Sequence, residues 1–457
     1  MRMDLEMKNT SNSDCTHCTI VVSLEMSDEP ILLSAALFAA LSTVSAQKLT
    51  FIPYADNGYL TGTLISPNGS YVAGSDLGGQ AFIYNTELGQ IKYFASPSLG
   101  DENSEDAEAD IRCISDEGVG VGYIENKACK FDFATGTYTL LLDEASTASF
   151  LSTDGTLTAG FTFDENNFGM LPYFQKDDEK HLLPCPTSDW LGYDSNGFAV
   201  TGGNSDGSIL VGYIQDDWAT HPLCIWVRNQ DGETYSVIPT SKRFYDASID
   251  LDGPQELDYF EGAAISENGK WICLNVHQKS SEDNGLVIAR YNVPFETVEF
   301  INCPDVTPNT WYYANSISND GTIVGYIEDQ ISYGRKGMIC LAGETEAKRL
   351  TEVYPDVPEL KQLDLNDFHT PCAITPDGRY IEGFGYVDYD ETSLCFGTYF
   401  LDTQASGSGV ERISSADNTA KVVASFDVDG KNKHFRKSGR ALRIDKLANG
   451  RTRKVAE

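Results

Sequence analysis

One short turn motif recurs along most of this chain and limits its fold more than any other feature. The motif has Ser or Thr first, Asp or Asn third and Gly fourth, with small departures, as in Ser66-Pro67-Asn68-Gly69. Each copy precedes an alternating apolar run, and intervals between copies range from 37 to 62 residues, close to the length of a four-stranded propeller blade. Seven copies are present, with their glycines at Gly69, Gly118, Gly155, Gly207, Gly269, Gly321 and Gly378.

The segments around each turn read as short strands. An apolar strand such as GAAIS precedes the turn, and a third strand such as CIWV follows after a loop. We therefore expect an all-β chain: a seven-bladed β-propeller over residues 47–403, with a small C-terminal β-tail. The early segment 49–53 is expected to complete the last blade. Because Asp or Asn stands directly before Gly, the sequence predicts type I′ turns, in which both central residues have positive φ.

The repeat also resembles a known family. Residues 316–326, SISNDGTIVGY, are similar to the repeat of the extracellular HAF-repeat proteins, as is AFIY at 81–84. The resemblance implies a propeller-like fold and assigns no single chemistry.

The N-terminal 46 residues are predicted to be a leader with a signal peptide. Residues 31–44 form an apolar run of 14, too short for a bilayer, which needs about 20. Small residues at 44–46 precede Gln47 as at a signal-peptide cleavage site, but the flank at 27–30 is acidic where such peptides are basic. The competing interpretation is a buried helix in a cytoplasmic protein. Export is the preferred prediction, with no membrane span in the mature chain.

The C-terminal end differs in charge from the rest. Residues 421–457 carry 11 Lys and Arg against 4 Asp and Glu, after a linker at 404–420. Strand-like runs separated by Asp429-Gly430 and Asn449-Gly450 resemble the last motif of Por-type (type IX) sorting domains of Bacteroidota, although Ser438 replaces the usual Lys. The resemblance covers about 35 residues and implies contact with the secretion machinery and a secreted or outer-membrane-surface location. The alternative is an ordinary basic tail on an acidic body.

The composition excludes some partners. With 33 Lys and Arg against 68 Asp and Glu, the net charge is −35, which disfavours nucleic acid and anionic membranes. No catalytic motif stands in its required context, so the catalytic residues are unknown; a non-catalytic chain is the preferred prediction, and an enzyme stays open as the alternative. The cysteines fall at similar strand positions, with Cys113 and Cys372 placed alike, which favours core thiols over disulfides.

A binding site is expected on the face opposite the short turns. In antiparallel units the long second-to-third loops share that face with the links between blades, and such loops commonly carry sites. Aromatic rings beside carboxylates suit sugars, although loop rings also pack locally. The candidate ligand-binding residues are Trp190, Tyr193, Asp217, Trp218, Tyr245, Trp311, Tyr312, Tyr333, Arg335 and Tyr389.

Oxygen-bearing side chains at Asp250, Asp252 and Glu256 make calcium the candidate cofactor. The leading hypothesis is an exported propeller that binds a glycan or protein ligand on the long-loop face. The alternatives are a secreted carbohydrate-active hydrolase or lyase that uses carboxylates there, and a structural or adhesion component of the cell surface.

Overall fold

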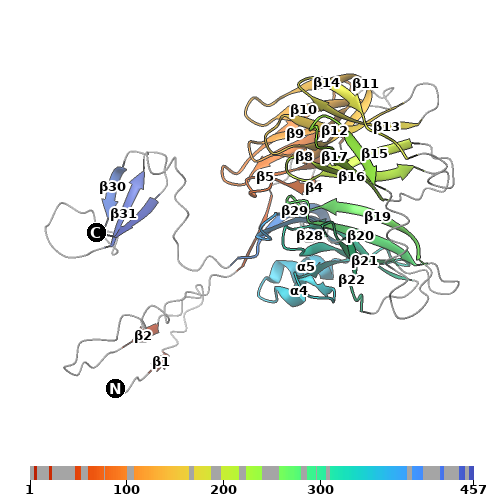
Figure 1. Ribbon diagram of the computed structural model, residues 1–457. Coiled ribbons are helices and arrows are strands. Elements are labelled where there is room, and N and C mark those ends of the chain that lie inside the picture. The colour runs from red at the N-terminus through yellow and green to blue at the C-terminus, as the bar shows by residue number, and fades with distance from the viewer. Residues whose placement is uncertain are drawn as a thin grey trace. The chain divides into compact units, whose positions relative to one another are not determined.

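The computed structural model describes two compact units, residues 46–405 and a second unit made of 1–45 with 406–457 (Figure 1). The described residues are 5–7, 20–22, 47–52, 60–76, 78–99, 108–163, 169–186, 197–215, 223–238, 257–278, 286–294, 296–304, 309–388, 394–404, 422–426, 442–447 and 452–456.

The larger unit consists of successive antiparallel sheets, which confirms the predicted all-β class and the arrangement of a β-propeller. The first sheet is β4 (Leu60–Ile65), β5 (Tyr71–Asp76), β6 (Ala81–Asn85) and β7 (Gln90–Phe94). Three later sheets also have four strands: β19 (Leu257–Ile265), β20 (Trp271–Gln278), β21 (Leu286–Asn292) and β22 (Thr297–Phe300); β23 (Thr310–Ile317), β24 (Ile323–Asp329), β25 (Arg335–Cys340) and β26 (Lys348–Arg349); and β27 (His369–Ile374), β28 (Tyr380–Asp388), β29 (Leu394–Asp402) and β3 (Lys48–Phe51).

The intervening strands form one 11-stranded sheet. It is continuous because the 15-residue strand β11 pairs with β10 through its first part and with β12 through its last part. A single parallel pairing, Met170 with Gly197, links β13 to β15. Its strands are β8 (Ala109–Ile114), β9 (Val119–Ile124), β10 (Lys127–Asp132), β11 (Thr137–Leu151), β12 (Leu157–Phe163), β13 (Met170–Lys176), β14 (Glu179–Leu182), β15 (Gly197–Gly203), β16 (Ile209–Gln215), β17 (Leu223–Arg228) and β18 (Tyr235–Ile238).

The N-terminal strand completes the last sheet, as predicted. Strand β3 pairs with β29 in the register Leu49 to Leu401 and Phe51 to Tyr399. Within the larger unit, the last sheet also contacts the first sheet. Thr398 in β29 accepts a hydrogen bond of 2.7 Å from the Gly62 N–H of β4, across 336 residues. Figure 1 shows β29 beside β4.

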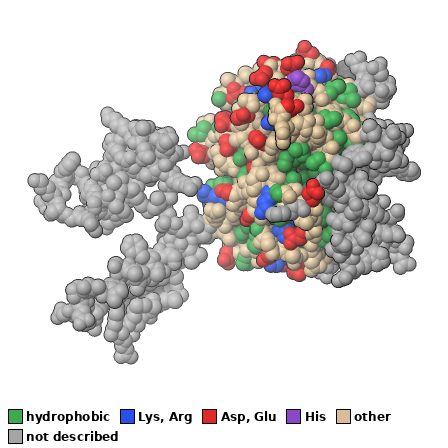
Figure 2. All heavy atoms as spheres, viewed as in Figure 1, with side chains coloured by type: hydrophobic (Ala, Val, Ile, Leu, Met, Phe, Trp, Pro, Cys, Tyr) green, Lys and Arg blue, Asp and Glu red, His purple; other side chains and the backbone are tan. Residues whose placement is uncertain are grey.

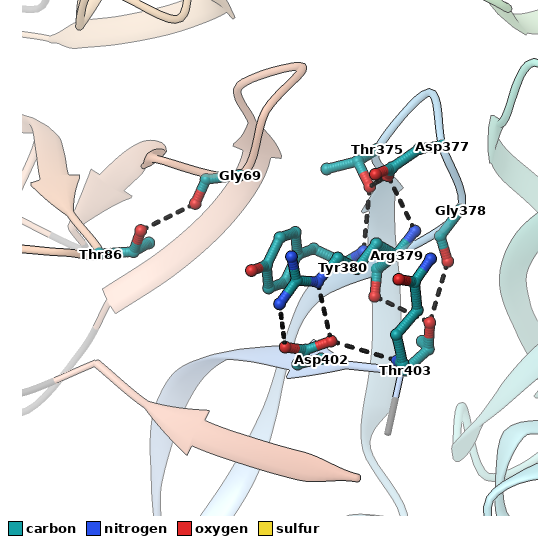
Figure 3. Close-up of polar contacts among 10 residues, drawn as sticks. Gly69, Thr86, Thr375, Asp377, Gly378, Arg379, Tyr380, Asp402 and Thr403 are labelled. Atoms are coloured by element: carbon teal, nitrogen blue, oxygen red, sulfur yellow. Dashed lines mark hydrogen bonds and ion pairs between the residues drawn. The ribbon is translucent and has the colours of Figure 1, made fainter. Parts of the chain in front are cut away.

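The repeated turn is held by its own side chains, and Figure 3 shows the copy before β28. The Thr375 hydroxyl donates to the Asp377 carboxylate at 2.7 Å, which also accepts the Arg379 N–H at 3.0 Å. Thr375 in turn accepts the Tyr380 N–H at 2.9 Å. The prediction of type I′ geometry is wrong, because only the glycine of each turn has positive φ. The Asp or Asn keeps negative φ since it must aim its side chain back at the hydroxyl.

Each turn also contacts the neighbouring sheet of the larger unit. A Cβ on Gly69 would lie 2.4 Å from the Tyr380 ring, and one on Gly118 would lie 2.7 Å from the Tyr71 ring. Each ring belongs to the residue five positions after the first residue of the motif in its own sheet. The contact between the last sheet and the first sheet therefore repeats the contact between consecutive sheets.

Apolar residues of facing sheets fill the space between units, and two short helices, α4 (Leu350–Val353) and α5 (Pro358–Leu365), join β26 to β27. The eight cysteines whose side chains are described are unpaired, and Cys129, Cys224, Cys273, Cys303 and Cys340 are buried.

The smaller unit contains a two-stranded pair, β1 (Leu5–Met7) with β2 (Ile20–Val22). It also contains the three-stranded sheet of β30 (Val422–Phe426), β31 (Leu442–Leu447) and β32 (Thr452–Ala456). No helix in the part of the chain that the structure describes is long and apolar enough to cross a bilayer.

Candidate functional site

Most of the predicted site residues lie outside the described residues, and their roles stay predictions. Nowhere in the described ranges do three or more His, Cys, Asp or Glu side chains gather in a way that would hold a metal ion. The residues outside are Trp190, Tyr193, Asp217, Trp218, Tyr245 and Tyr389, together with the calcium candidates Asp250, Asp252 and Glu256.

Two of the four described candidates, Trp311 and Arg335, lie in the same sheet on either side of Glu328. Both pair with Glu328 across the sheet, Trp311 from β23 and Arg335 from β25. The Arg335 guanidinium lies 2.7 Å from the Glu328 carboxylate and stacks over the rings of Tyr326 and Phe368, at 4.5 and 4.9 Å from their centroids. These protein contacts on three sides fix the position of Arg335 between the units of β23–β26 and β27–β29.

Tyr312 takes a different position from the one expected. It is 3% exposed and belongs to the hydrophobic core, and its hydroxyl donates to the Pro304 carbonyl. Alternate residues of a strand face opposite sides, so placing Trp311 toward one neighbouring unit buries Tyr312 against the other. Tyr312 therefore presents no surface to a ligand.

Tyr333 belongs to a group of exposed apolar side chains. Leu365, Ile331 and Tyr333 are 77%, 73% and 68% exposed, more than any other large hydrophobic residue in the described ranges. They lie in the β24–β25 loop and at the end of α5, and these segments touch, because the Arg335 N–H donates to the Asp367 carbonyl at 2.9 Å. We call these three residues the apolar tip patch. It lies on the side of the unit away from the repeated turns.

A second candidate site was missed by the sequence reasoning: a cavity of about 190 Å³ at the end of the inner strands where the turns lie. It is lined from β4, β8, β11, β15, β19, β23 and β27. The lining forms three layers. The rim has Pro67, Asp116, Thr153, Glu267 and Pro376; the apolar collar has Ile65, Ile114, Leu151, Gly203, Ile265, Ile317 and Ile374; and the interior layer includes Arg112, Ser149 and Thr201.

The layers follow from the repeat. The rim residues stand second in each turn motif, and the collar residues stand directly before it. Every inner strand carries a β-bulge three residues before the motif, where the pairing skips one residue. A bulge turns the extra side chain out of the regular alternation. The skipped residues are Thr63, Arg112, Ser149, Thr201, Ala263, Asn315 and Cys372.

The bulge corrects one detail of the sequence reasoning. Cys372 is the skipped residue of its strand, whereas Cys113 is the residue after the skipped one. The two thiols are therefore not at equivalent positions.

The rim is acidic. Burial raises the pKa of Asp116, although the hydrogen bond of 2.8 Å from the Asn68 N–H lowers it. Burial also raises the pKa of Glu267, and the Asp116 carboxylate raises it further. The Glu267 carboxylate has no hydrogen bond or ion pair with any described residue. The one cationic group in the lining, Arg112, stands three residues before the motif, and its half-exposed guanidinium pairs with Asp110 at 2.8 Å.

Asp364, His369 and Tyr399 form a chain of hydrogen bonds in the order acid, imidazole, hydroxyl, as in a catalytic relay, but the chain is buried. His369 joins Asp364 at 2.7 Å through Nδ1 and the Tyr399 hydroxyl at 2.8 Å through Nε2. His369 and Tyr399 are both fully buried, so no substrate reaches them. The chain fastens α5 to β27 and β29.

Comparisons with known proteins show little beyond this architecture. No protein-family model matches the sequence, and no curated protein matches it. Among solved structures, the oligogalacturonate lyase of Vibrio parahaemolyticus is 12% identical, with a TM-score of 0.39, over 79% of this chain and 98% of that one.

The β-propeller domain of Cps50 (Swd1) from Myceliophthora thermophila is also 12% identical, with a TM-score of 0.45, over 74% of this chain and 96% of that domain. The RRP9 WD40 repeats are 8% identical, with a TM-score of 0.42, over 78% and 97%. Likenesses this low carry no argument about function, and the chain is a β-propeller-type repeat protein by its own sheets.

Proposed function

We propose that this chain is an exported, seven-bladed β-propeller without catalytic activity, which binds a glycan or protein ligand on its long-loop face. One observation carries the proposal: the three most exposed large apolar side chains of the described ranges, Leu365, Ile331 and Tyr333, stand on two segments of that face that are joined by the Arg335–Asp367 hydrogen bond. Exposed apolar groups that gather rather than scatter mark interaction surfaces.

The surroundings of the apolar tip patch favour binding over catalysis. The neighbouring guanidinium of Arg335 is held by Glu328, Tyr326 and Phe368, so the patch rests on a rigid base. A preorganised surface loses little side-chain entropy when a ligand binds. Asp367, 60% exposed, pairs with Lys336 beside the patch and supplies a polar edge.

Seven blades are supported by the seven bulged inner strands that line one cavity, and by the contact of the last unit with the first. Export and a surface location are supported by the apolar run at 31–44 and the basic C-terminal segment. The number of blades and the location are parts of the proposal.

The test uses the full chain, immobilised and probed with a glycan array and with extracted cell-surface proteins. We expect Ile331→Asp and Leu365→Asp to weaken binding at least tenfold, because a charge replaces buried apolar contact at the interface. Leu88→Asp is the matched control: Leu88 is 62% exposed, but it lies in the β6–β7 turn on the opposite side.

Equal loss in all three variants, or binding that survives both patch variants, would remove the patch from the proposal. Cleavage of a bound glycan would support the hydrolase or lyase alternative instead.

A further inference from the structure

We infer that the cavity at the turn end of the inner strands binds a small organic cation, an amine with an apolar body, and holds its ammonium group at the rim between Asp116 and Glu267. This site lies away from the apolar tip patch and serves a separate ligand.

The cavity is open at the rim, and its volume limits the size of the ligand that it can hold. A cavity of about 150 Å³ accommodates benzene, so one of about 190 Å³ takes a molecule of roughly six to eight heavy atoms. Its collar supplies isoleucine or leucine from six of the inner strands, a continuous apolar wall for an alkyl or aryl body.

The rim is rigid. The Thr153 N–H donates to the Ser205 carbonyl and the Ser205 N–H to the Glu267 carbonyl, each at 2.8 Å. Similarly, the Asn319 N–H donates to the Pro376 carbonyl at 2.9 Å. These bonds run from one unit to the next, so the rim residues are held in place before a ligand arrives, and binding does not have to order them.

The charge at the rim selects the ligand's sign. Asp116 and Glu267 are the two acidic groups of the described lining, and no Lys or Arg stands at the rim. Among the described residues, the Glu267 carboxylate has no hydrogen-bond or ion-pair partner, and the Asp116 carboxylate has one backbone N–H. An ammonium group supplies the missing donors to both carboxylates, whereas an anion is repelled. Asp and Glu outnumber Lys and Arg by 68 to 33 in the whole chain, and Figure 2 shows carboxylates spread over the described surface in view, which also favours the approach of cations.

The interior provides a second, independent sign of a ligand. Ser149 is 7% exposed and lines the cavity, and its hydroxyl hydrogen-bonds to no described residue. The hydroxyl is open to the cavity, so a polar group of a ligand held there can form a hydrogen bond with it. The bulge that turns this side chain out of the regular alternation is the same one that places Arg112 and Thr201 in the lining.

The experiment compares three probes with the same body and different charge, n-hexylamine, n-hexanol and hexanoate, by calorimetric titration of the full chain at neutral pH. We expect hexylamine to bind at least tenfold more tightly than hexanol, and hexanoate to bind most weakly. Glu267→Gln and Asp116→Asn should each lower the affinity for hexylamine about tenfold while leaving that for hexanol unchanged.

Three further variants make the result decisive. Glu117→Gln removes an exposed carboxylate that neighbours Asp116 but does not line the cavity, and it should lower the affinity for hexylamine far less than either rim variant. Thr201→Trp fills the interior and should abolish binding of all three probes. Ile331→Asp should leave hexylamine binding intact, which separates this site from the proposed function. Equal affinity for the three probes, no binding of any, or insensitivity to both rim variants would overturn the inference.

Discussion

Two contacts between neighbouring sheets of the larger unit each bury an acidic or basic side chain, Arg290 in one and Glu382 in the other, and the surroundings of the two differ. Between β19–β22 and β23–β26, the buried Arg290 donates to the Gly321 carbonyl at 2.9 Å and to the Leu341 carbonyl at 3.2 Å, with a further bond to Glu344. Its Nε lies 3.1 Å from the Glu299 carboxylate. Between β27–β29 and β4, Glu382 is fully buried, and neither carboxylate oxygen has a hydrogen-bond partner among the described residues.

The comparison shows that the interface around Arg290 is stabilised by a charged side chain, whereas the interface around Glu382 only accommodates a titratable one. At the Arg290 interface the cation is required, because three carbonyls and a carboxylate depend on it. At the closing interface, burial raises the pKa of Glu382 well above its usual range and keeps it neutral. Corresponding positions in other units hold small apolar residues such as Ala73 and Val121, so Glu382 departs from the repeat where the last unit meets the first.

The largest effect is expected at Arg290. Arg290→Met should lower the free energy of unfolding by about 3–5 kcal/mol, because it leaves buried carbonyls and Glu299 without their donor. Arg228→Met is the matched control, since Arg228 bonds only to Asp206 and Tyr235 on a partly exposed surface, and it should cost about 1 kcal/mol. Urea unfolding monitored by tryptophan fluorescence measures both. Equal losses would contradict the special role assigned to Arg290.

The next effect depends on pH and concerns Glu382. In the folded state the Glu382 carboxyl keeps a proton that it loses near pH 4.3 in the unfolded chain. Its contribution to the free energy of unfolding is therefore fully present below that pH and falls as the pH rises toward the raised pKa. The slope is about 1.4 kcal/mol per pH unit for one proton. Cys372 and Tyr399 beside it also have raised pKa values and stay neutral over the same range.

Glu382→Gln should remove this slope while preserving the shape of the side chain. The difference in unfolding free energy between the variant and the native chain should therefore change steadily as the pH rises above the ordinary pKa of glutamate. A difference that stays constant with pH would show that Glu382 is ionised, and hence partnered, in the folded state.

A smaller loss is expected at the glycine that faces Glu382. A Cβ on Gly62 would lie 2.4 Å from the Thr398 side chain and 2.5 Å from the Glu382 carboxylate. Gly62→Ala should therefore destabilise the chain by about 2 kcal/mol through overpacking. Gly202→Ala, in the inner strand β15, meets only Val211 at 3.8 Å and should be nearly neutral. If both variants unfold alike, the closing interface is not as tight as the contact implies.

The sequence predicted what local chemistry determines. Turn motifs, strand alternation and the closing strand β3 were all readable, because each depends on residues close together in the chain or on period-two patterning. The bulges were not, because a one-residue slip leaves no compositional mark, and so Cys113 and Cys372 were wrongly equated. Glu382 and the rim pair Asp116 and Glu267 also escaped prediction, because their environment comes from strands hundreds of residues away. The apolar tip patch was found in part, through Tyr333, but its aliphatic members Ile331 and Leu365 carried no signal.

The smallest effect compares two turn glycines with the same backbone conformation. Gly69 and Gly155 have φ of 78° and 70°, so alanine at either position costs about 1 kcal/mol of backbone strain. A Cβ at Gly155 meets nothing within 4 Å, whereas one at Gly69 runs into the Tyr380 ring of the last unit. Gly69→Ala should therefore lose about 1 kcal/mol more than Gly155→Ala. Tyr380→Ala combined with Gly69→Ala should show less than the sum of the two separate losses, since the clash is gone. Strict additivity would mean that the Tyr380 ring does not cover Gly69, and that the last and first units meet more loosely than consecutive ones.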